Sequence, residues 1–117
     1  MQYYNKNIIL QFRFKIAAAD FKAVGTKAIE KLREGAVSVP GWSLVPNNFE
    51  GVRVACDAQS GDGWLLLRLS LHDPVLPLNI QSDSRGGVKI IAQKLLALLD
   101  GIADMDVSPV TKYVTSH

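Results

Sequence analysis

A short segment near the middle of the chain carries the side chains best suited to hold an anion. Within seven residues it offers a guanidinium, a hydroxyl, an imidazole, a carboxylate and a ring-restricted backbone: Arg68, Ser70, His72, Asp73 and Pro74. The guanidinium is permanently charged, and its fork of five donors matches a phosphate or carboxylate. The amides of a tight turn can converge on the same oxygens. The segment therefore predicts a phosphate-binding turn.

An apolar strand must position this turn. The run Leu65-Leu66-Leu67 favours a buried strand within 63–71, and an arginine at the end of such a strand must reach an anion or water. The alternative for Arg68 is a salt bridge to a nearby carboxylate such as that of Asp73. For Ser70, the alternative is a hydroxyl that bonds its own backbone.

The remaining polar residues have supporting roles in this prediction. His72 can donate to phosphate, more strongly when protonated, so phosphate affinity is expected to vary with pH near about 6.5; its alternative is an exposed turn residue. Asp73 would repel phosphate directly and is expected to orient His72 or Arg68, while Pro74 fixes the turn. Arg85 precedes a helix N-terminus, where anions bind favourably, and is a weaker phosphate-binding candidate against the alternative of a solvated arginine.

Residues 63–74 resemble the phosphate-binding loop of the α-D-phosphohexomutases, the family of phosphomannomutase and phosphoglucomutase. The C-terminal domain of that family carries Arg-x-Ser-Gly/Asn-Thr-Glu-Pro, and a bacterial branch reads Ser-Leu-His-Asp-Pro, as residues 70–74 do. The resemblance extends over Glu50-Gly51-Val52-Arg53-Val54, Gly61-Asp62-Gly63-Trp64, the strand 76–82 and the helix 86–99. It covers about residues 49–100 of the printed sequence.

The resemblance implies that Arg68 and Ser70 contact the non-transferred phosphate of a phosphosugar. Three departures from the family loop are Leu71 for Gly/Asn, His72 for Thr and Asp73 for Glu. The family's phosphoserine segment and its Asp-x-Asp-x-Asp magnesium loop belong to other domains and do not occur in this sequence. The chain alone is therefore not expected to transfer a phosphoryl group or to hold a cofactor, since Mg²⁺ is a property of the parent enzyme.

The order of elements predicts an α+β fold. Alternation over 8–16 predicts a strand with one wet face, and Asp20 and Gly35 bound a helix. A short strand at 42–45, strands at 51–57, 63–71 and 75–82, and a helix over 88–99 follow. Because the connections are too short for parallel crossovers, we expect an antiparallel sheet of about four to five strands with two helices packed on one face. The related family domain has this TATA-box-binding-protein-like arrangement.

Residues 1–101 are predicted to form this domain. Residues 102–117 contain Pro109, scattered polar residues and few apolar ones, so they are predicted to be a tail or a weakly docked arm.

Composition narrows the function classes. The 13 basic residues are nearly balanced by 11 acidic ones and form no dense run, which argues against nucleic acid. Cys56 is the only cysteine, so an intrachain disulfide and a multi-cysteine metal site are excluded. No run approaches the ~18 apolar residues that span a bilayer, and the N-terminus lacks a signal-peptide pattern. We therefore expect a cytoplasmic protein with no membrane partner.

Two functions remain. The first is a phosphate-binding domain of a phosphomannomutase/phosphoglucomutase-like protein, with a phosphosugar or inorganic phosphate as its partner. The second is a stand-alone binding or assembly module that keeps the fold without mutase activity, with other mutase domains or a second copy as its partner. Sugar specificity would lie largely on domains outside this chain.

Overall fold

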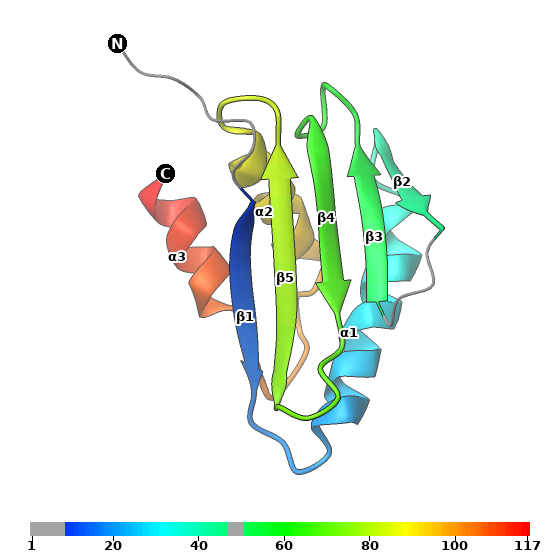
Figure 1. Ribbon diagram of the computed structural model, residues 1–117, viewed down its shortest axis with the longest axis vertical. Helices are drawn as coiled ribbons and strands as arrows, with labels where there is room; N and C mark the ends of the chain where they lie inside the picture. The colour runs from blue at the N-terminus through cyan, green and yellow to red at the C-terminus, as the bar shows by residue number, and fades with distance from the viewer. Residues whose placement is uncertain (1–8, 47–50) are drawn as a thin grey trace.

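Six antiparallel strands form one sheet in residues 9–46 and 51–117, the parts of the chain that the computed structural model describes. The strands are β1 (Leu10–Ile16), β2 (Trp42–Val45), β3 (Gly51–Cys56), β4 (Gly63–Arg68), β5 (Val75–Ser82) and β6 (Met105–Asp106). Their spatial order is β2-β3-β4-β5-β1-β6 (Figure 1). Consecutive strands β2 to β5 therefore form a meander, and β1 joins it on the far side of β5.

Helices cover one face of this sheet. The helices are α1 (Phe21–Ala36), α2 (Gly87–Leu98) and α3 (Ser108–Ser116). The Asp20 carboxylate accepts a hydrogen bond from Ala23 N at 3.1 Å and caps α1, as the sequence predicts. The viewer of Figure 1 faces the sheet with α1 and α2 behind it, and α3 lies beside β1. The expected α+β architecture is confirmed, with one more strand than the upper expectation and a third helix.

The core lies between the sheet and the helices. Alternate strand residues point into it, and its fully buried members include Phe14, Val54, Leu65, Leu67, Leu76, Leu78, Ile80, Leu32, Ile91 and Leu95. Burial of each such side chain stabilises the fold by about 1.5–3 kcal/mol. This layer fixes which way every strand side chain points, and so determines what the opposite face carries.

The opposite face of the sheet carries no helix in the described residues, and we call it the open face (Figure 1). By strand alternation its members are Gln11, Arg13 and Lys15 of β1, Arg53 of β3, Trp64, Leu66 and Arg68 of β4, and Val75, Pro77, Asn79 and Gln81 of β5. Apolar and cationic side chains are mixed on it.

Strand β4 ends at Arg68, three residues before the predicted end at Leu71. The ladder between β4 and β5 runs from Gly63 opposite Ser82 to Leu67 opposite Leu78. The next pair would join Arg68 to Pro77, which has no N–H to donate. The chain is therefore released into its turn immediately after Arg68.

Residues 102–117 are more ordered than the expected tail. Met105–Asp106 pairs with β1 as β6, and α3 places Val110 in the core with 0% exposure. The Asp106 carboxylate accepts from Ser108 N at 2.9 Å at the start of α3, and this bond holds the pKa of Asp106 below its usual value. The segment therefore extends the sheet and the helical layer.

Ile8 and Glu50, which the sequence assigns to strands, lie outside the described residues. Within the described ranges, none of the helices combines the length and the apolar character that crossing a membrane requires.

Candidate functional site

Arg68 is the last residue of β4 and belongs to the open face. Its neighbours Leu65 and Leu67 point toward the helices and are fully buried. The Arg68 Nε atom is buried and has no hydrogen-bond partner in the described parts of the chain. Within residues 9–46 and 51–117 no ion pair joins Arg68 to Asp73 or to another carboxylate. A buried guanidinium nitrogen without an acceptor is a costly arrangement that a bound anion would relieve.

The turn that follows is tied down at its base. Ser70 Oγ accepts a hydrogen bond from Asp73 N at 3.1 Å, and the Asp73 carbonyl accepts from Val75 N at 2.7 Å. The Pro74 carbonyl accepts from Ile16 N at 2.8 Å, which links the turn to β1. The Ser70 oxygen thus accepts a local backbone hydrogen bond, which was the alternative to phosphate binding for this residue. Its hydroxyl hydrogen remains able to donate to an anion.

The tip of the turn faces solvent. Leu71 is 53% exposed, and His72, Asp73 and Pro74 are exposed as well. The backbone N–H groups of Leu71 and His72 have no hydrogen-bond partner among residues 9–46 and 51–117. The tip therefore exposes amide and imidazole donors in the turn that follows Arg68, together with the Asp73 carboxylate.

Arg85 does not join this group. It lies in the connection from β5 to α2, whereas residues 69–74 connect β4 to β5 at the opposite end of the sheet (Figure 1). The eight residues of β5 separate the two connections by roughly 25 Å. Arg85 is exposed there, so one phosphate cannot contact both arginines.

The end of the sheet near Arg85 is closed by a buried hydroxyl. Ser82 is 1% exposed, and its Oγ atom lies within hydrogen-bonding distance of the carbonyls of Gly61, Asp62 and Ser84 while accepting from Ser84 N at 3.1 Å. The Ser84 hydroxyl donates to the Asp62 carboxylate. Gly61-Asp62-Gly63 is thus part of a bonded turn, and sequence reasoning missed Ser82 as its anchor.

Gly87 is part of the same closure. A Cβ atom at Gly87 would overlap Ser82 Oγ and the Gly61 carbonyl oxygen. Only glycine therefore lets α2 begin this close to the 57–62 turn, where the Ser82 and Ser84 hydroxyls bond groups of Gly61 and Asp62.

Two hollows lie beside β2 and β3, away from the predicted turn. One has a volume of about 220 Å³ and is bounded by Arg33, Leu44, Val45, Pro46, Gly51, Val52 and Arg53. The other, of about 370 Å³, lies on the open face and is bounded by Val45, Pro46, Arg53, Ala55, Gly63, Trp64 and Leu66. Neither includes a residue of the 68–74 turn.

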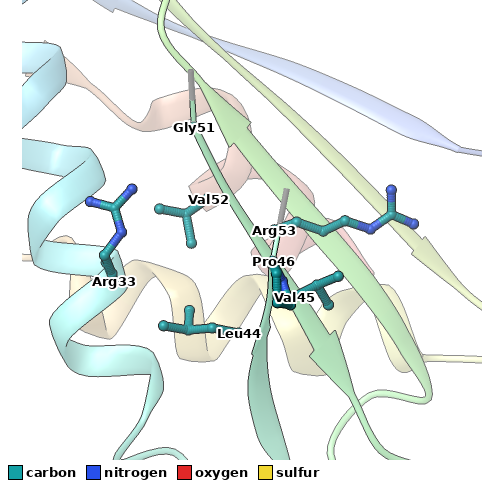
Figure 2. A pocket seen from close by; sticks show the side chains of 7 residues that line it. All are labelled: Arg33, Leu44, Val45, Pro46, Gly51, Val52 and Arg53. Carbon is teal, nitrogen blue, oxygen red and sulfur yellow. The ribbon is translucent and has the colours of Figure 1, made fainter. Parts of the chain in front are cut away.

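The arginines at these hollows already have partners. Figure 2 shows Arg33 on the helix side with Leu44 and Val52, while Arg53 extends away from them. The Arg33 guanidinium pairs with the Glu30 carboxylate. The Arg53 guanidinium carbon lies 4.4 Å from the centre of the Trp64 ring, a cation–π contact. Both contacts compete with any anion, so these hollows are weaker anion sites than the surroundings of Arg68.

Cys56 has the properties of a structural residue. It is 6% exposed, and burial, aided by the charge of Asp57, raises the pKa of its thiol from 9.0 to about 12. The thiol is therefore protonated and a poor nucleophile at neutral pH. No group of three or more metal-ligating side chains occurs in the described ranges.

Comparison of the chain with models of known families finds no match, and a search of curated proteins finds no relative.

Proposed function

We propose that this chain is a phosphate-binding domain of a phosphomannomutase/phosphoglucomutase-like protein, which clamps the non-transferred phosphate of a phosphosugar. The observation that carries the proposal is Arg68, whose buried Nε lacks an acceptor at the edge of an exposed turn with unpaired donors. The residues 70–74, which match the family loop, support the same assignment.

In this function the domain positions its ligand and breaks no bond. Arg68 supplies a fixed charge, the Ser70 hydroxyl and the free amides of Leu71 and His72 supply donors, and the short bonds at the base keep them in place. Holding one end of a substrate in this way lowers the entropic cost of reaction elsewhere. A cytoplasmic location belongs to the same proposal.

Titration with inorganic phosphate and with glucose 6-phosphate, followed by amide and arginine side-chain NMR, tests the proposal. Signals of residues 68–74 and of the Arg68 Nε–H group should shift together and saturate. In Arg68→Gln the shifts should be lost while the rest of the spectrum stays native. Unchanged signals in this turn at high millimolar phosphate would remove the assignment.

The open face favours one second candidate, a binding or assembly module. Trp64 and Leu66 are half-buried there beside the 370 Å³ hollow, although no helix covers them in the described residues. Sedimentation velocity at increasing concentration should then show an oligomer that Trp64→Glu dissolves. Its formation should be favoured by salt, because Arg13, Arg53 and Arg68 of two copies would face one another. A monomer at every concentration would leave phosphate binding as the function.

A further inference from the structure

The register of β5 brings a second arginine to the surroundings of Arg68. Pro77 pairs with Arg13 on one side, and the pairing of Leu67 with Leu78 places Arg68 beside Pro77 on the other. Arg13 and Arg68 therefore lie at the same level of the open face, one on each strand that flanks β5. Two strand spacings put their Cα atoms about 10 Å apart.

Neither arginine forms an ion pair with a described residue. Arg13 is exposed, whereas Arg68 is half-buried and its Nε atom is buried. Among the open-face neighbours, Gln11 and Asn79 are neutral, and Lys15 adds a further positive charge beyond Arg13. Asp106 lies opposite Lys15 on β6, at the far edge from Arg68.

Directly between the two arginines, the described residue on the open face is Pro77, which has no side-chain acceptor. A proline contributes an apolar ring there. On the other side of Arg68, its strand partner is Gly51, which has no side chain to cover it. Two like charges held at this separation repel each other unless an anion lies between them.

We propose that Arg13 is a binding residue that completes the anion site, and that Arg13 and Arg68 hold one phosphate dianion above Pro77. The inference rests on the proposed function and deepens it, because it adds a second guanidinium group to the donors of the 68–74 turn. The ligand class is a phosphomonoester dianion, which two guanidinium groups bind better than a carboxylate monoanion of similar size.

The experiment compares phosphate affinity at constant ionic strength in the wild type, Arg13→Gln, Arg13→Lys and Arg68→Gln, by NMR titration. Lys27→Gln is the matched control, since it removes one exposed positive charge from α1 on the other side of the sheet. Arg13→Gln should weaken phosphate binding on the order of tenfold, the worth of a charge-assisted hydrogen bond. Arg13→Lys should weaken phosphate binding less than Arg13→Gln does. Lys27→Gln should change the affinity for phosphate less than twofold.

A direct readout separates binding from a general charge effect. The Nε–H signals of Arg13 and Arg68 should shift with the same midpoint in the wild type, and glucose 6-phosphate should outcompete glucuronate. If Arg13→Gln behaves like Lys27→Gln, or if the Arg13 Nε–H signal stays still while that of Arg68 moves, the inference is wrong and the proposed function stands. If Arg68→Gln also binds phosphate normally, the proposed function falls with it.

Discussion

The two ends of the sheet use their polar groups in opposite ways. At the end formed by residues 57–62 and 82–87, the buried Ser82 hydroxyl and the Asp62 carboxylate join two connections. At the other end, hydrogen bonds hold the base of the 69–74 turn, while the amides of Leu71 and His72 and the Nε atom of Arg68 have no partner among the described residues. The first end thus joins two connections through side chains, whereas the second leaves donors unpaired within the described parts of the chain.

The two candidate arginines lie at these two different ends. Gly86 and Gly87 open α2 near Arg85, where the Ser82 hydroxyl bonds the neighbouring backbone groups. Arg68 instead precedes a turn, and its Nε atom is buried without a hydrogen-bond partner in the described residues.

The largest expected effect is at Gly87. Gly87→Ala should destabilise the fold by about 3 kcal/mol, because the new methyl group overlaps Ser82 Oγ and the Gly61 carbonyl. Gly86→Ala is the matched control: its φ of 79° is strained for alanine, but nothing lies within 4 Å, so about 1 kcal/mol is expected. Urea unfolding measures both. Equal losses would mean that this end is less tightly closed than described.

The second effect compares two serines that each bond a nearby backbone amide. Ser82→Ala should cost about 2 kcal/mol in the free energy of unfolding, because it strands buried polar groups at 1% exposure. Ser70→Ala removes a bond to Asp73 N that water can replace, so about 0.5 kcal/mol is expected. A costlier loss at Ser70 than at Ser82 in the same urea experiment would reverse the comparison.

The third effect follows from Cys56, which lies at the closed end opposite Gly63 and Trp42. Its raised pKa of about 12 means that its contribution to stability is complete below the ordinary value of 9.0 and is lost as pH rises from there toward 12. The free energy of unfolding, measured with urea, should fall over this pH window more for the wild type than for Cys56→Ser.

Reaction with a thiol-specific reagent at pH 8 sharpens the same contrast. Cys56 should react orders of magnitude more slowly in the folded protein than in urea, while the double variant Cys56→Ser, His72→Cys should react at the unfolded rate at the exposed turn. Rapid labelling of native Cys56 would show that the closed end opens readily.

The smallest effect on stability is expected at Arg68. Arg68→Gln should not lower the free energy of unfolding without ligand, because the buried Nε of Arg68 makes no hydrogen bond or ion pair with a described residue that would be lost. High phosphate should then raise the melting temperature of the wild type and leave that of the variant unchanged. A variant that unfolds without ligand would assign Arg68 a structural role.

Local patterns in the sequence predict most of the fold. The alternation of apolar and polar residues in 10–16 predicts β1, and the Asp20 cap predicts the start of α1. Each pattern lies within a few residues of the element that it determines. The third helix escapes prediction because its apolar residues are few, and Val110 becomes buried only where α2 and β1 provide a surface.

The site is predictable only in part for a related reason. The turn at 68–74 is contiguous in sequence, so its residues could be grouped before the structure was known. The neighbourhood of Arg13 and Pro77 depends on the pairing of β1 with β5, and the separation of Arg85 from Arg68 depends on the direction of β5. Both depend on the order and direction of the strands in the sheet, which a short stretch of sequence does not determine.

The place of β1 in the sheet also sets an order of events during folding. Strands β3, β4 and β5 are joined by short connections and can pair early. Strand β1 pairs later, because its Lys15 lies opposite Val75, sixty positions further along the chain. Closing so long a loop is slow, because the loss of chain entropy comes before the contacts that offset it are formed. Among the described strands, β1 comes first in sequence and is thus among the last to dock.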